Sequence, residues 1–186
     1  MAVMIIPEKM YGHRARVGYT SPPLTTEVFP YEFYKIVPEG VSLVITTLAI
    51  VVRSKTEVDQ SYDISMKAAR EMAAAGCDIV VLGGVPINLS RGAANAEQMI
   101  RDLEAELKVK VSTSASAQAR AAKALGCRKV VVAQPYAHED TDRIAGYSNH
   151  FGCEVLAAHQ AIVWDALRRC GVNDRIEGFG RLLREF

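Results

Sequence analysis

The apolar residues of this chain fall into short continuous runs separated by segments of helical spacing. Residues 79–82 are apolar throughout, which is typical of a strand buried on both faces of a sheet. Residues 57–75 carry apolar side chains on one helical face, and Gly76 follows as a left-handed stop. The same reading predicts strands at residues 15–20, 42–50, 79–82, 109–114, 129–134 and 153–158.

Helices are expected between these strands. The predicted segments are a short helix within 27–34, helices at 57–75 and 96–107, one ending at 125, one stopping near 152, and a last one at 161–170. Asn88 or Ser90 can cap the third of them, and Asp140 or Thr141 the fifth. Because strands and helices alternate, the pattern predicts an α/β fold with a parallel sheet and helical crossovers.

Loops at the carboxyl ends of the strands are the expected ligand site. Gly83 and Gly84 follow the buried strand directly, where backbone without a Cβ can turn sharply or approach a ligand. In a parallel sheet this edge is where ligands bind, and free N–H groups there suit a carboxylate or a phosphate. Pro22 and Pro23 should end the first strand, since proline cannot continue a central ladder. A tight connection without a ligand is the alternative interpretation of the glycine pair.

Composition narrows the class of protein. The chain has 186 residues, 49% of them hydrophobic, and a net charge of +1, which predicts a soluble globular protein. It has no basic stripe that would favour nucleic acid and no apolar run long enough to span a membrane. The opening residues are too quickly followed by charge to form a signal peptide. We therefore expect a cytoplasmic protein without nucleic-acid or membrane partners.

The cysteines favour packing over chemistry. Cys77, Cys127 and Cys153 each follow a glycine at a helix-to-strand junction, which is typical of a buried small hydrophobe. Cys170, at the end of the last helix, is also expected to pack. The spacing of cysteines and histidines fits neither a disulfide framework nor a metal site.

Several motifs together resemble one family. They are S-P-P-L-T-T-E, G-G-V-P, S-T-S-A-S, A-L-G-C-R-K-V-V-V-A-Q-P-Y and H-Q-A-I-V-W-D-A-L-R-R. In this order and spacing they resemble the arylmalonate decarboxylase and maleate isomerase group of the aspartate/glutamate racemase superfamily. The resemblance implies two α/β lobes around a cleft, no cofactor, and small carboxylate substrates that pass through an enediolate-like anion. In such proteins one cysteine from each lobe can move a proton on opposite faces of the substrate.

Carried over position by position, the resemblance gives a set of substrate-binding residues. The set is Pro22, Pro23, Thr25, Gly84, Val85, Pro86, Ser114, Ser116 and Tyr136. Tyr136 matches the family tyrosine whose hydroxyl binds the substrate carboxylate, and the double proline matches the decarboxylase.

The sequence departs from the family pattern at three points, which weakens the transfer of these site residues to this chain. Gly84 stands where the family has its first-lobe cysteine, which disfavours a two-cysteine racemase or a maleate isomerase. Val85 and Pro86 stand where the decarboxylase has two hydroxyl residues. Two further strands of the family, the first carrying the second-lobe cysteine, have no counterpart between Ala158 and His159, so the catalytic residue stays unassigned. An internal deletion in the gene, or a sequence that joins segments not adjacent in the natural chain, would each explain this.

The expected layout is a first lobe at 1–125, a shortened second lobe at 126–160, and a C-terminal helix at 161–186 packing back on the first lobe. Two functions follow. One is a cofactor-independent decarboxylase- or isomerase-type enzyme on a small carboxylate or malonate-like dicarboxylate. The other is a non-catalytic carboxylate-binding or remnant protein of the same fold. Substrate identity, stereochemistry and assembly into a homo-oligomer stay open.

Overall fold

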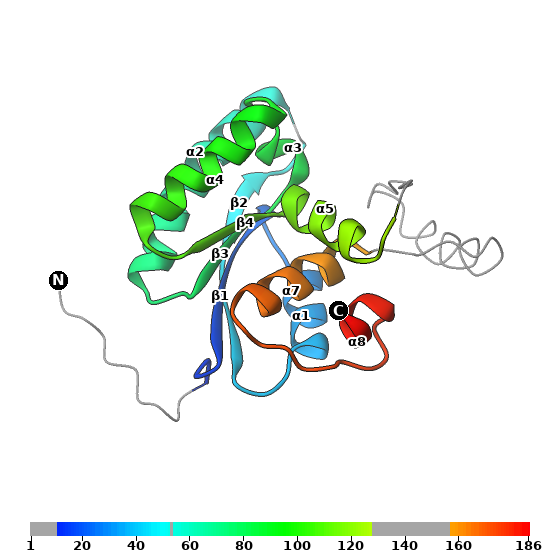
Figure 1. Ribbon diagram of the computed structural model, residues 1–186. Helices are drawn as coiled ribbons and strands as arrows, with labels where there is room; N and C mark the ends of the chain where they lie inside the picture. Colours follow the sequence, from blue (N-terminus) through cyan, green and yellow to red (C-terminus); the bar gives the residue numbers. More distant parts are fainter. Residues whose placement is uncertain (1–10, 53, 128–156) are drawn as a thin grey trace.

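A computed structural model describes residues 11–52, 54–127 and 157–186 of the chain. Four parallel strands form one sheet in the order β2-β1-β3-β4, which confirms the predicted α/β class (Figure 1). The strands are β1 (Ala15–Pro23), β2 (Val41–Ile50), β3 (Ile79–Leu82) and β4 (Lys110–Thr113). Parallel neighbours align their carboxyl ends at one edge of the sheet, and that edge carries the loops of interest.

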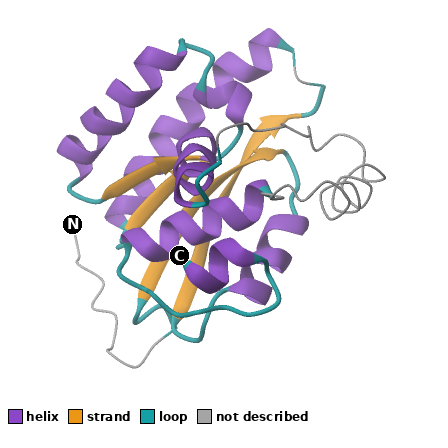
Figure 2. Cartoon of the chain, turned by 45° about the vertical axis from the view of Figure 1, so that its right-hand side comes forward, coloured by secondary structure: helices purple, strands orange, loops and turns teal. Residues whose placement is uncertain are grey.

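Helices cover both faces of this sheet (Figure 2). The helices are α1 (Val28–Ile36), α2 (Lys55–Ala74), α3 (Val85–Asn88), α4 (Ala93–Leu107), α5 (Ser114–Ala124), α7 (Ala158–Arg169) and α8 (Arg181–Glu185). In Figure 1, α2 and α4 lie on one side of the strands, and α1, α7 and α8 on the other. The described residues therefore form three layers with the sheet in the middle.

The core is divided between the two faces of β3. Ile79 and Val81 pack with residues of α1 and α7, whereas Val80 and Leu82 pack with residues of α2 and α4. This alternation follows from the two-residue period of a strand. All four side chains are at most 1% exposed, and each contributes about 1.5–3 kcal/mol by leaving water. Burial on both faces is the physical reason for the unbroken apolar run.

The first strand is longer than predicted. It was expected to end at Thr20, but it pairs with β2 through Pro23, with a shift in register after Ser21. The prediction was wrong because β1 pairs with β3 only at residues 17–20. Beyond Thr20, β1 has a neighbour on one side, and proline is tolerated on such a locally exposed edge.

The predicted start of α4 was also wrong. Asn88 is the last residue of α3, and its side-chain amide reaches the carbonyl of Gly83 at 3.5 Å. Ser90 donates its hydroxyl to the carbonyl of Ile87 at 2.8 Å, so it completes a local turn. The residue that precedes α4 is Gly92, which has no side chain to cap with.

The C-terminal segment packs back on the sheet through α7, whose residues Ile162, Val163 and Leu167 are buried in the α1 face of the core. The predicted strand at 153–158 was wrong at Ala157 and Ala158, which precede and begin this helix. Residues 153–156 of that strand, the strand at 129–134 and the helix after Asp140 or Thr141 lie outside the described residues.

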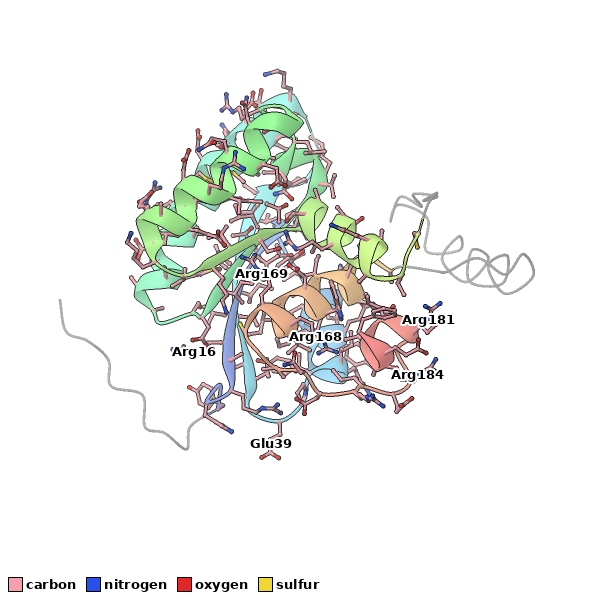
Figure 3. The ribbon with its side chains drawn as sticks, viewed as in Figure 1. Arg16, Glu39, Arg168, Arg169, Arg181 and Arg184 are labelled. Atoms are coloured by element: carbon pink, nitrogen blue, oxygen red, sulfur yellow. The ribbon has the colours of Figure 1, made fainter. Side chains whose placement is uncertain are left out.

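Arg168 joins α7 to the segment that follows it. Its guanidinium donates to four backbone carbonyls, those of Val172, Asp174, Leu183 and Phe186, at 2.6–3.4 Å. Figure 3 shows its side chain beside that segment, next to α8. The short helix α8, which the sequence pattern did not predict, is held in this way against α7.

Candidate functional site at the carboxyl edge

The loops after β1 and β3 are in contact. The Gly83 N–H donates to the hydroxyl of Thr20 at 2.9 Å. A Cβ built on Gly84 would lie 2.8 Å from the Cγ of Pro22. The structure therefore brings together Pro22 and Gly84, two residues that the sequence placed in one site.

Close approach explains why this loop is built from glycine. A Cβ on Gly83 would lie 1.9 Å from the Thr20 carbonyl oxygen, a distance no side chain can occupy. Gly84 has φ +84°, a conformation that residues with a Cβ rarely adopt. The loop backbone therefore lies directly on the end of β1, and its amides stay uncovered by side chains of their own.

Tyr19 connects the same edge to the loop after β4. Its ring is 4% exposed and stacks on Phe29 with a centroid separation of 3.8 Å. Its hydroxyl shares a hydrogen bond with the side chain of Ser114, the first residue of α5. Burial raises the pKa of Tyr19 to about 12, against the opposing effect of Ser114, so the phenol keeps its proton at neutral pH.

Ser114 and Ser116 have different environments. Ser114 is buried at the edge beside Tyr19. Ser116 closes a capping box with Thr113: its amide donates to the Thr113 hydroxyl at 3.0 Å, and its own hydroxyl accepts from the Thr113 amide at 3.0 Å. The hydroxyl of Ser116 is therefore engaged in starting α5, which leaves Ser114 as the better placed of the two to meet a ligand.

A half-buried ion pair joins α5 to α7. Arg120 on α5 donates to both carboxylate oxygens of Asp165 on α7, at 2.6 and 2.8 Å. The Asp165 side chain is 2% exposed. Ser112 and Ser116 complete the network, since both accept from Arg120 and Ser112 also donates to Asp165. The pair thus ties α7 to the start of α5.

Two further titratable groups face each other between α1 and α7. The imidazole Nδ1 of His159 is hydrogen-bonded to the carboxylate of Glu32. The imidazole also packs edge-on against Phe29, with centroids 5.1 Å apart. Because Phe29 stacks on Tyr19, the pair is linked by ring contacts to the site edge. No sequence motif marks this pairing, because the two residues are 127 positions apart.

The other residues of the predicted set are less enclosed. Pro23 and Thr25 are exposed. Val85 and Pro86 open α3, where Val85 offers a backbone N–H and Pro86 offers none. Tyr136 lies outside the described residues.

Cys77 and Cys170 are not activated thiols. Burial raises the pKa of Cys77 and of Cys170 to about 11 in each case, far from the lowered values of reactive cysteines. Cys77 precedes β3, so it lies at the opposite edge from Gly84, roughly 20 Å away at the rise of a strand. Within the described residues no cluster of histidine, cysteine and carboxylate groups could hold a metal ion, and no helix is long and apolar enough to cross a bilayer.

The strand order and the contact between the loops define an α/β protein whose loops meet at the carboxyl ends of its strands, the edge where ligands bind in open parallel sheets. A match to the arylmalonate decarboxylase family spans residues 17–163, from β1 into α7. The chain therefore belongs to the arylmalonate decarboxylase family.

Solved structures have the same fold. An arylmalonate decarboxylase matches with a TM-score of 0.68 and 18% identity, over 90% of this chain and 98% of that one. The maleate isomerase Iso from Pseudomonas putida matches with a TM-score of 0.73 and 18% identity, over 92% and 98%. The maleate cis-trans isomerase of Nocardia farcinica, bound to Tris, gives 0.74 and 14%, over 92% and 98%. A comparison with curated proteins finds no match.

Proposed function

We propose that this protein is a cofactor-independent enzyme of decarboxylase or isomerase type. Its substrate is a small carboxylate, with a malonate-like dicarboxylate as the first candidate, and the reaction passes through an enediolate-like anion. Membership in the arylmalonate decarboxylase family supports the reaction class. The observation that carries the site is the meeting of Pro22, Gly84 and Ser114 at one edge of the sheet, with Tyr19 between the loops.

The chemistry at this edge is stabilisation of developing negative charge. When one carboxylate is lost as carbon dioxide, or when a proton is removed from the carbon, the electron pair of the broken bond stays behind and its charge spreads onto the oxygens of the remaining carboxylate. Donors fixed in advance around those oxygens lower the barrier because they need no reorganisation. The amides of Gly84 and Val85 and the hydroxyl of Ser114 are the donors we assign to this role. Proline rings at residues 22 and 23 supply an apolar wall.

The remaining assignments extend this proposal. We assign Thr25, Pro86, Ser116 and Tyr136 to the outer part of the same site, and residues 126–160 to a shortened second lobe. A cytoplasmic location fits a small-carboxylate substrate, and self-association of the chain is part of the proposal to be measured.

The alternative is a carboxylate-binding protein without turnover. Gly84 has no side chain to donate a proton, and the thiols of Cys77 and Cys170 are buried with raised pKa values. A proton donor must lie within about 3 Å of the reacting carbon. Neither Cys77 nor Cys170 is suited to this role, so binding without catalysis is the outcome that this observation favours.

Turnover of a substrate panel separates the two functions. Purified protein would be mixed with phenylmalonate and with maleate, and carbon dioxide release and fumarate formation would be followed, with malonate binding measured by calorimetry. Product formation supports the enzyme; malonate binding without product supports the alternative. Failure to bind any of the three overturns both.

The proton donor is identified by two variants in any active preparation. Loss of turnover in Cys153→Ala with activity kept in His159→Gln would assign a cysteine mechanism. The reverse pattern would assign proton transfer to the imidazole that Glu32 orients. A comparison of the measured intact mass with the mass that the gene encodes would show whether a second-lobe segment is missing.

A further inference from the structure

We infer that Tyr19 and Thr20, at the end of β1, are positioning residues that set the spacing between the Ser114 hydroxyl and the Gly84 amide. This inference rests on the proposed function, because it concerns how that site holds a carboxylate. The two residues are adjacent in the strand, so their side chains leave on opposite faces of the sheet. Each therefore reaches a different loop.

Thr20 holds the peptide before Gly83, and Asn88 approaches the next peptide, which carries the Gly84 N–H. Thr20 is fully buried, and its hydroxyl accepts from the Gly83 N–H at 2.9 Å. The Gly83 carbonyl is approached by the side-chain amide of Asn88 at 3.5 Å. A trans peptide is planar, with its C=O and N–H pointing in opposite directions. Holding the Gly83 carbonyl toward α3 therefore turns the Gly84 N–H away from α3.

Tyr19 reaches across β3 to the loop after β4. The strand order β1-β3-β4 places Ser114 beyond the neighbouring strand, and only a long side chain can span that gap. Room for it comes from Gly83, where a Cβ would lie 2.9 Å from both the Tyr19 hydroxyl and its ring carbon Cζ. Stacking on Phe29 keeps the ring in one orientation.

The direction of the Tyr19–Ser114 hydrogen bond matters for binding. A serine hydroxyl has one proton to donate and two lone pairs to accept with. For the serine proton to be left for a carboxylate oxygen, the neutral Tyr19 phenol must donate to Ser114, and this is the arrangement we infer for the ligand-bound protein. Hydrogen bonds in such a chain polarise one another, so the terminal serine becomes a stronger donor. Tyr19 and Thr20 thus act through Ser114 and Gly84 without contacting substrate.

Isosteric variants test the roles of Tyr19 and Thr20 separately. Tyr19→Phe and Thr20→Val remove one oxygen apiece, and Thr20→Ser restores the acceptor. Matched controls are Tyr34→Phe, an exposed tyrosine whose hydroxyl accepts from the Leu43 amide, and Thr47→Val, exposed on β2. Malonate affinity is expected to fall roughly tenfold or more in the two test variants, the scale of a charged hydrogen bond. It should stay within about twofold in Thr20→Ser and in both controls.

A double variant distinguishes a positioning role of Tyr19 from a general effect on protein stability. Added to Ser114→Ala, the Tyr19→Phe change should cause no further loss of malonate affinity, because its effect passes through that serine. Full additivity would overturn the assignment of Tyr19. So would unchanged affinity in Tyr19→Phe when the wild-type protein binds malonate.

A measurement without ligand keeps the test independent of the proposed function. Amide exchange at Gly83 should speed up roughly tenfold in Thr20→Val, with exchange in α2 unchanged, and return to the wild-type rate in Thr20→Ser. Unchanged exchange at Gly83 overturns the role of Thr20, whether or not malonate binds. Faster exchange in a protein that binds no malonate would support the positioning contacts and contradict the proposed substrate class.

Discussion

Gly84 lies so close to Pro22 that a Cβ added to the glycine would be 2.8 Å from the Cγ of the proline ring. The contact joins the loop after β3 to the end of β1, and it occurs where φ is +84°. Crowding and backbone conformation both exclude a side chain here. The first-lobe cysteine that the resemblance implies at this position would therefore require Pro22 or the loop backbone to move.

Substitution of Gly84 should be more costly than substitution at another left-handed glycine. Gly84→Ala is expected to lower the free energy of unfolding by about 1–3 kcal/mol, the range for a residue held in a sparsely populated conformation, with the contact to Pro22 placing it at the upper end. Gly126→Ala is the control, because Gly126 has φ +70° and nothing lies within 4 Å of an added Cβ. Urea denaturation of both variants would compare them; equal losses would show that the Pro22 contact carries no energetic weight.

Asp165 should be the most sensitive buried polar residue. Asp165→Ala removes the carboxylate that holds the Arg120 guanidinium and leaves that cation beside the sheet. Breaking a buried pair of this kind is expected to lower the free energy of unfolding by about 2–4 kcal/mol, less than the full range because the Arg120 side chain is 39% exposed.

The control for this prediction is Asp102→Ala on the exposed face of α4, where the carboxylate accepts from Gln98. That change is expected to stay within about 0.5 kcal/mol. A wild-type denaturation midpoint in Asp165→Ala would show that the ion pair does not tie α7 to α5.

The raised thiol pKa values predict a loss of stability at alkaline pH. Burial raises the pKa of Cys77 and Cys170 to about 11, above the value near 8.5 of an unfolded cysteine. Between these values the folded chain keeps protons that the unfolded chain has released, so stability falls as pH rises. The contribution is fully present below about pH 8.5 and is lost toward pH 11; Tyr19, with a pKa of about 12, adds a loss above pH 10.

Two measurements check this pH dependence of stability. Urea midpoints at pH 8 and pH 10.5 should fall less steeply in a Cys77→Ala, Cys170→Ala double variant than in the wild type. At pH 8 in native buffer, both thiols should react with iodoacetamide far more slowly than in urea. Rapid native alkylation of either one would contradict its burial.

The elements with strong local signals could be predicted from sequence. The residues of β3 are apolar without a break because both faces are covered, and α2 carries an apolar face that Gly76 ends with φ +83°. The loop Gly83–Gly84 could be placed at the carboxyl edge for the same reason, since it follows β3 directly. The proline boundary of β1 was misjudged because it depends on which strands lie beside it, a non-local property.

The site was predicted less completely than the fold. Sequence could not separate Ser114 from Ser116, because both follow β4; the capping geometry of Thr113 decides between them. Nor could it show that the Tyr19 hydroxyl crosses β3, because that requires the strand order. The Arg120–Asp165 pair joins residues 45 positions apart with no motif to mark them.

Mapping malonate on the folded chain would show directly whether a carboxylate binds where the loops after β3 and β4 begin. A titration of isotopically labelled protein with malonate, followed by amide chemical shifts, would locate the bound carboxylate without assuming turnover. Saturable shifts are expected at Gly83, Gly84, Val85 and Ser114, with Gly40 and Gly76, at the opposite edge of the sheet, unaffected. Shifts confined to the opposite edge, or none at Gly84 and Ser114 at saturating malonate, would contradict this expectation.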